Sequence, residues 1–132
     1  MTKRVTIDDF MSRSPHSIGQ EQSLLVAHEL MRKYAVRHLP VLHAGQLVGL
    51  LSLRDLHLVE TLPDVDPAQV TIEEAMSGDP FVVPPGSDLA EVAEQMAEHK
   101  YGSAVVMEGT KIIGVFTTVD GMRALAHLLR SQ

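Results

Sequence analysis

An internal duplication is the strongest constraint on the fold of this chain. Thr6 aligns with Thr71, which sets a shift of 65 residues, and the register then continues without a gap. Residues that mark turns and segment ends repeat in phase: Met11 with Met76, Ser12 with Ser77, Pro15 with Pro80, Gly49 with Gly114 and Asp55 with Asp120. This period is too long for one unit of a solenoid, so it predicts two copies of one supersecondary motif.

Each copy has the residue pattern of the element order β-α-β-β-α. An extended piece at 17–18 or 81–83 precedes an amphipathic helix, which Ser23 caps in one copy and Ser87 or Asp88 in the other. Two apolar runs separated by glycine then predict a hairpin in each copy, at 39–42 with 47–51 and at 103–107 with 112–116. A second helix is expected to begin near Asp55 and near Asp120.

The chain is therefore predicted to be a mixed α/β (α+β) protein. Repeat 1 covers residues 1–62, an acidic linker bracketed by prolines covers 63–69, and repeat 2 covers 70–132. One copy alone would expose a sheet edge and an apolar helix face. We therefore expect the two β-α-β-β-α repeats to pack on each other with pseudo-twofold symmetry.

The composition disfavours several classes of function. A net charge of -6 argues against a nucleic-acid partner. The seven histidines lack the spacing of a ligand pair and the chain has no cysteine, so we expect no metal site. Catalytic motifs are absent as well, which predicts a protein that is not an enzyme. Asp8 and Asp9 stand where a signal peptide needs apolar residues, and no long apolar run follows, so a cytoplasmic protein without membrane contact is expected.

A motif of glycine, two apolar residues, a hydroxyl residue and an aspartate ends the hairpin of each copy, at 49–55 and at 114–120. It places Ser52 or Thr117 at the strand end and the aspartate in the first turn of a helix. Such a carboxylate can accept hydrogen bonds from both ribose hydroxyls, each worth about 1.5 to 3 kcal/mol. The same spacing also forms a capping box in helices without any ligand, and the sequence leaves both interpretations open.

From Thr6 to about Leu125 the chain resembles a tandem pair of cystathionine-β-synthase (CBS) domains, also called a Bateman module. Thr-Ile-x-x-x-Met opens each copy, His-Leu-Pro-Val at 38–41 and Gly-Ser-Ala-Val-Val at 102–106 form the middle strands, and the glycine-to-aspartate motif closes each copy. The resemblance implies an adenosine ligand held between two sheets. AMP, ADP and ATP come first, and NAD and S-adenosylmethionine come second.

The resemblance also implies a ligand site in each copy. The second-copy site comprises Asp120 for ribose, Thr117 and Thr118 near ribose and phosphate, Val82 and Val83 beside adenine, and Tyr101, Gly102, Ser103 and Ala104 along its edge. The first-copy site comprises Asp55, Ser52, Arg54, Ser17, Ile18, Val36, Arg37, His38 and Leu39. The family has a small residue where this chain has Arg37, so Arg37 either binds a phosphate or fills the cleft.

The leading interpretation is a regulatory sensor that binds an adenine nucleotide and passes a change of geometry to an unknown protein partner. A homodimer formed through the last helix, with Met122, Leu125, Leu128 and Leu129, is implied by the resemblance. One alternative is a ligand-free protein-interaction scaffold dimer, which a cleft closed by Arg37 favours. Another is a small enzyme acting on a nucleotide, for which the clustered charges are the only supporting feature of the sequence.

Overall fold

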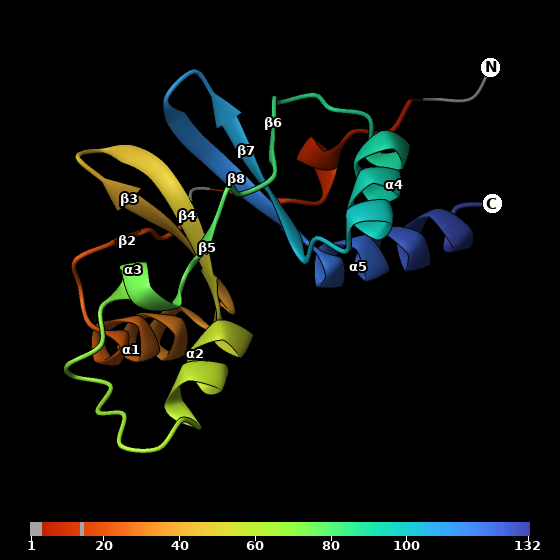
Figure 1. Ribbon diagram of the computed structural model, residues 1–132. Coiled ribbons are helices and arrows are strands. Elements are labelled where there is room, and N and C mark those ends of the chain that lie inside the picture. Colours follow the sequence, from red (N-terminus) through yellow and green to blue (C-terminus); the bar gives the residue numbers. More distant parts are fainter. Residues whose placement is uncertain (1–3, 14) are drawn as a thin grey trace. The chain divides into compact units, whose positions relative to one another are not determined.

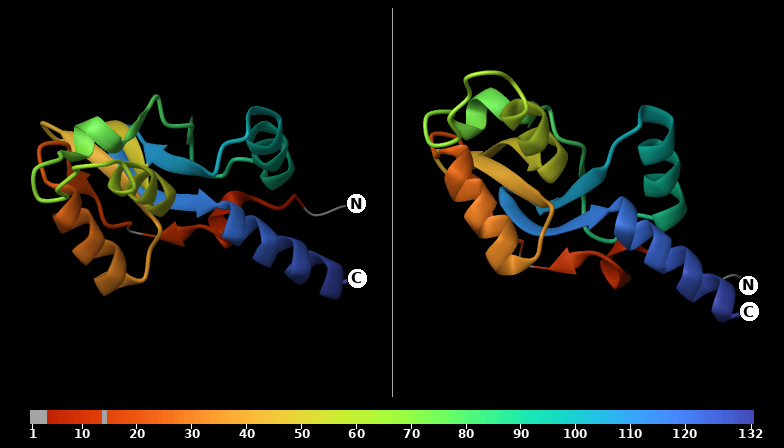
Figure 2. Two further views of the ribbon diagram at one scale, coloured as in Figure 1. Left: turned by 60° about the horizontal axis from the view of Figure 1, so that its bottom comes forward. Right: turned by 90° about the horizontal axis from the view of Figure 1, so that it is seen from below.

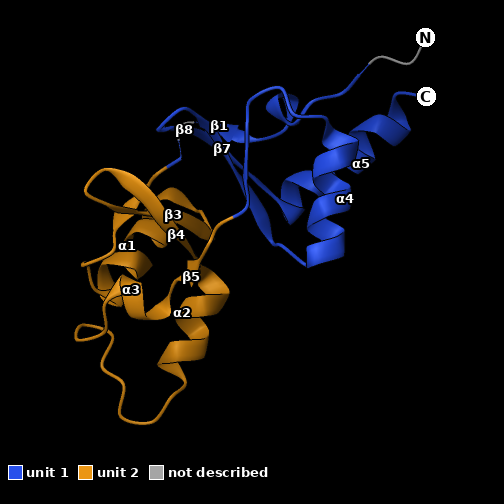
Figure 3. Cartoon of the chain, turned by 45° about the horizontal axis from the view of Figure 1, so that its top comes forward, with its two compact units in different colours: residues 1–15, 81–132 blue, residues 16–80 orange. Residues whose placement is uncertain are grey.

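The computed structural model describes residues 4–13 and 15–132 and has a mixed α+β architecture (Figure 1). The chain forms two compact units, one of residues 16–80 and the other of residues 1–15 with 81–132 (Figure 3). Each unit contains a four-stranded sheet of its own.

The unit of residues 16–80 carries a sheet with the strand order β2-β3-β4-β5. Its elements are β2 (Ile18–Gly19), α1 (Leu24–Tyr34), β3 (His38–His43), β4 (Gln46–Ser52), α2 (Leu53–Glu60), α3 (Ile72–Ala75) and β5 (Ser77–Gly78). Strand β2 is parallel to β3, whereas the pairs β3-β4 and β4-β5 are antiparallel.

The other unit carries a sheet with the strand order β1-β8-β7-β6. Its elements are a 3-10 turn (Ile7–Asp9), β1 (Ser12–Arg13), β6 (Val82–Val83), α4 (Leu89–His99), β7 (Ser103–Glu108), β8 (Lys111–Thr117) and α5 (Thr118–Arg130). In both views of Figure 2, α5 runs on from the end of β8 toward the C-terminus.

The predicted element order is confirmed in both copies, and the helices begin where the capping residues predict. The Ser23 hydroxyl accepts a hydrogen bond from the Val26 N–H, and the Asp88 carboxylate accepts one from the Glu91 N–H. Both helices end in a left-handed residue, Ala35 in one copy and Lys100 in the other. The duplication therefore extends to the detailed geometry of the helix ends.

The compact units do not coincide with the sequence repeats, because the segments that open the two copies are exchanged. These leading segments are residues 4–13 and 70–78. Strand β1 of the first copy pairs with β8 of the second, and β5 of the second copy pairs with β4 of the first. The chain consequently crosses from one unit to the other at residues 15–16 and again at 80–81.

The repeated glycines explain why the leading segments fit so closely. A Cβ atom on Gly114 would lie 2.9 Å from the Ser12 carbonyl oxygen, and one on Gly49 would lie 2.8 Å from that of Ser77. Only glycine permits backbones to approach to this distance. The glycine of each copy thus accommodates the leading segment of the other.

Each unit is built around its own hydrophobic core. Ile7 from the first leading segment joins the core of β6, α4, β7 and β8, and Ile72 from the second joins the core of β2, α1, β3 and β4. Both isoleucines are fully buried. No helix among the described residues has the length and apolar character needed to span a membrane.

Candidate functional site

The second-copy site lies where β7 begins and β8 ends. Ser103 is paired with Thr117 across the two strands, and the Thr118 N–H donates to the Gly102 carbonyl over 3.1 Å. Helix α5 starts at this point, so its first turn is held against the beginning of β7. Four of the predicted residues are thereby fixed side by side by the backbone alone.

Asp120 occupies the third position of α5 and forms a reciprocal capping box with Thr117. Its Oδ2 accepts from the Thr117 N–H over 2.9 Å and from the Thr117 hydroxyl over 3.1 Å. Asp120 as a whole is only 4% exposed, and its Oδ1 faces the exposed Arg123 guanidinium at 3.7 Å. The capping interpretation is thus confirmed, and the capping bonds leave Oδ1 as the oxygen available to another donor.

Ser103 supplies the clearest chemical anomaly of this region. Its hydroxyl oxygen is buried, and within the described parts of the chain it has no hydrogen-bond partner. A buried polar group without a partner costs roughly 1 to 3 kcal/mol, so such groups are rare in folded proteins. A donor or acceptor from outside the chain would remove this cost.

The remaining second-copy residues divide into exposed and buried groups. Tyr101 stacks on Phe81 with ring centroids 5.0 Å apart, and the neighbouring Val82 is 44% exposed. These side chains offer an apolar surface of the kind on which a purine ring can rest. Val83 and Ala104 belong to the hydrophobic core, so a ligand can meet Ala104 only through its backbone.

The first-copy site begins with the same local structure. The Ser52 N–H donates to the Asp55 carboxylate over 2.9 Å, and the Asp55 N–H donates to the Ser52 hydroxyl over 3.0 Å. Asp55 accepts this one hydrogen bond and is half-buried, whereas Asp120 accepts two and is buried. The two capping boxes are therefore alike in design and different in environment.

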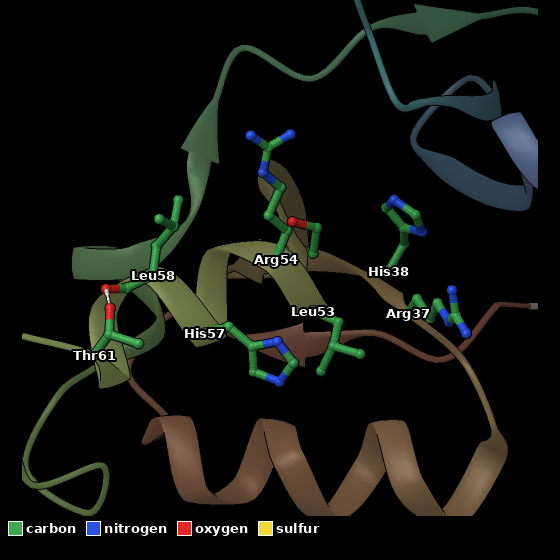
Figure 4. Close-up of a pocket in the computed structure, with 8 residues that line it drawn as sticks. Arg37, His38, Leu53, Arg54, His57, Leu58 and Thr61 are labelled. Atoms are coloured by element: carbon green, nitrogen blue, oxygen red, sulfur yellow. Dashed lines mark hydrogen bonds between the residues drawn. The ribbon is translucent and has the colours of Figure 1, made fainter.

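A cavity of about 460 Å³ adjoins the start of α2, inside the unit of residues 16–80 (Figure 4). It brings together four predicted first-copy residues, Arg37, His38, Ser52 and Arg54, and adds Leu53, His57, Leu58 and Thr61. In Figure 4 the side chains of Arg54 and His38 lie on one side of Leu53, and His57 points toward α1. Arg37 is exposed at the wall of this cavity.

The other predicted first-copy residues do not line this cavity. Ile18 and Leu39 are buried in the core, Ser17 is exposed, and Val36 borders a neighbouring cavity of about 500 Å³. Their part in ligand binding stays a prediction. Beyond the motif, the helical spacing of Arg54, His57, Leu58 and Thr61 was the signal that would have identified the missing residues.

His28 and His57 lie near each other beside these cavities. His28 on α1 contacts the Glu60 carboxylate on α2, and the His57 ring lies 6.4 Å from that of His28. No group of three or more side chains suited to a metal ion occurs among the described residues.

The sequence model of the CBS domain family matches residues 7–59 and 72–127. An inosine-5'-monophosphate dehydrogenase of Korarchaeum cryptofilum is 29% identical over 91% of this chain, which spans only 24% of that enzyme.

Solved structures share the fold over nearly the whole chain. CBSX2, determined in complex with AMP, is 26% identical with a TM-score of 0.79, over 92% of this chain and 97% of that one. The CBS domain pair of protein MJ0100, determined with 5'-methylthioadenosine and S-adenosyl-L-methionine, is 21% identical with a TM-score of 0.85. That match covers 95% of this chain and 98% of the other, and its low identity relates the two proteins by fold alone.

Proposed function

The chain belongs to the CBS domain family as a tandem pair, and on this premise we propose that it is a regulatory module that binds an adenosine nucleotide. AMP, ADP or ATP is the proposed ligand, with NAD and S-adenosylmethionine as further members of the same class. The proposal includes a cytoplasmic location, where these nucleotides are made and consumed, and a role without catalysis.

The unpartnered hydroxyl of Ser103 is the observation that carries the proposal. It is buried beside Thr117, whose hydroxyl and N–H already hold one oxygen of Asp120. A nucleoside offers both kinds of group that this corner lacks: ribose hydroxyls that can donate to Asp120 Oδ1, and acceptors for Ser103. The exposed ring of Tyr101, stacked on the partly buried ring of Phe81, supplies a surface for the base.

A change of Ser103 to alanine separates a ligand-binding role from a structural one. Ser103→Ala removes an unsatisfied polar atom, so the unliganded protein should keep or raise its unfolding midpoint. AMP should bind about tenfold more weakly, since one hydrogen bond worth roughly 1.4 kcal/mol is lost. Thermal unfolding and calorimetry with AMP, ADP, ATP, NAD and S-adenosylmethionine measure both quantities.

Thr110→Ala is the matched control, because it removes an exposed hydroxyl at the tip of the same hairpin. It should leave both stability and AMP affinity unchanged. A saturating ligand at 100 times its dissociation constant should stabilise the wild type by about 2.7 kcal/mol. If none of the five ligands shifts the midpoint, the nucleotide proposal is wrong and the ligand-free scaffold takes its place.

We further propose that the module acts as a homodimer, and that α5 supplies the contact. Val119, Met122, Leu125 and Leu129 are between 47% and 64% exposed on this helix. Apolar side chains gathered on one helix mark an interaction surface. Changing Leu125 and Leu129 to glutamine should convert the dimer to a monomer in light scattering, and an unchanged mass would remove α5 from the interface.

A further inference from the structure

The second half of α5 has little of its surface buried against its own unit. Ala124 is buried, and among the described residues of the helix beyond it Leu128 alone is partly shielded. The helix is roughly 20 Å long, and its second half extends away from the sheet (Figure 2). The position of this end of α5 therefore depends on the few side chains that touch its inner face.

Phe10 of the first leading segment supplies a contact on that inner face. Its ring meets the His127 ring edge to face, with the centroids 5.7 Å apart and the planes at 65°. His127 and Leu128 follow Ala124 by three and four positions, so the three side chains share one side of the helix. Phe10 and Leu128 both pack against the core of this unit. The ring pair thus joins the second half of α5 to the leading segment.

The leading segment holds Phe10 in place without help from α5. The Leu89 N–H donates to the Val5 carbonyl over 2.9 Å. The Ile7 N–H donates to the Ser87 carbonyl over 3.1 Å, and Ile7 is fully buried. The Phe10 N–H closes the 3-10 turn by donating to the Ile7 carbonyl over 3.0 Å. Backbone hydrogen bonds and the core therefore fix where the Phe10 ring is presented to the helix.

The other unit lacks this contact. Ala75 and Leu62 stand at the positions equivalent to Phe10 and His127. Helix α2 ends at Glu60, and Leu62 lies beyond it and is 55% exposed. The ring pair therefore distinguishes α5, the helix whose outer face is the proposed dimer contact, from its counterpart α2.

We infer that Phe10 is a positioning residue for the dimer surface of α5: it holds the second half of the helix so that the outer face can meet a second copy of the chain. Phe10 lies in the first sequence repeat and His127 in the second, so the contact gives the first repeat a direct hold on the dimer helix of the second. The inference rests on the proposed homodimer for its partner, whereas the hold on α5 is made within a single chain.

The test compares the full chain with Phe10→Ala. In hydrogen exchange followed by mass spectrometry, the amides of residues 125–130 should exchange roughly tenfold faster in the variant. Those of residues 121–123, next to the capping box, should keep their rate. Light scattering should show a dimer that is weaker by about tenfold or more. AMP should bind with an affinity changed by less than about threefold, because its proposed site lies at the other end of α5.

Phe81→Ala is the matched control, because it removes the same side chain from the same core, where the Phe81 ring stacks on Tyr101. It should leave both the exchange of residues 125–130 and the affinity of the dimer unchanged. Phe10→Tyr keeps the ring and should behave as the wild type in both measurements.

The outcomes separate this inference from the proposed homodimer. Unchanged exchange of residues 125–130 in Phe10→Ala, or equal acceleration in Phe81→Ala, would overturn the hold on α5 in any oligomeric state. Faster exchange with an unchanged dimer affinity would overturn the positioning role. A monomeric wild type would contradict the homodimer, and faster exchange in Phe10→Ala would then support the hold on α5 while removing the second copy as its partner.

Discussion

Helices α2 and α5 occupy equivalent positions in the two units and begin with the same capping box, yet they present different surfaces. Helix α2 has eight residues, and Arg54 and His57 on the helix and Thr61 directly after it line the cavity. Helix α5 has thirteen residues and has Val119, Met122 and Ala126 at those positions. The comparison teaches that the duplicated motif fixes where a helix begins, while its outer side chains are free to acquire a separate role.

The two repeated glycines give the largest expected effect and test whether the copies are equally constrained. Gly114→Ala and Gly49→Ala each place a Cβ within 3.0 Å of a carbonyl oxygen of the opposite leading segment. Each should lower the free energy of unfolding by about 1 to 3 kcal/mol, as overpacking does. Urea denaturation measures the loss.

Gly78→Ala is the control for both variants, because a Cβ on Gly78 would meet nothing within 4 Å. It should change the free energy of unfolding by less than about 0.5 kcal/mol. A loss for Gly78→Ala as large as for the other two would show that the close approach to the leading segment does not explain the effect, because the lower entropy of the unfolded chain by itself favours alanine.

The cores of the two units differ in one pair of facing side chains: two leucines in one unit correspond to a small and a large side chain in the other. This difference provides the next test. Leu39 faces Leu51 across β3 and β4, whereas Ala104 faces Phe116 across β7 and β8. Phe116→Leu should destabilise the protein by roughly 1 to 2 kcal/mol through the cavity that it leaves. Adding Ala104→Leu should restore most of that loss, since the pair then matches the other unit.

A double-mutant cycle by chemical denaturation measures this coupling between Ala104 and Phe116. Ala104→Leu alone serves as the second single variant and should also destabilise, because Ala104 is fully buried against Phe116. If the losses of the two single variants simply add in the double variant, Ala104 and Phe116 are not energetically coupled. The cores of the two units would then not be related by this exchange of side chains.

The capping aspartates give the smallest effect. Asp55→Ala and Asp120→Ala each remove a capping box, at a cost of about 1 kcal/mol. Asp120→Ala should cost more, because Asp120 accepts two hydrogen bonds from Thr117 and Asp55 accepts one from Ser52. Thermal unfolding without ligand ranks the two variants, and an equal or reversed order would show that the hydroxyl bond of Thr117 contributes nothing.

The sequence predicted the elements well, since each depends on a local pattern. Ser23 and Asp88 begin helices because their side chains bond the first turn, and this requires no knowledge of the rest of the chain. The exchange of leading segments could not be predicted. Met11 and Met76 have similar sequence surroundings, so pairing within a copy and pairing between copies look alike before the chain is folded.

The family resemblance implied a first-copy site, and four of its residues, Arg37, His38, Ser52 and Arg54, line one cavity. Their part in ligand binding stays a prediction. His57 joins them only because one helical turn brings it to the face of Arg54, whereas the repeated motif ends at Asp55. The missing partner of Ser103 is likewise a property of packing, which residue identity alone does not contain.

The exchanged leading segments also bear on how such a chain could arise. A polypeptide with one copy would lack the strand that pairs with β4 or β8 and the isoleucine that completes its core. Two such molecules could complete each other by trading their first strands, as in domain-swapped dimers. Fusing the two genes would make that trade intramolecular, so that assembly would no longer depend on protein concentration.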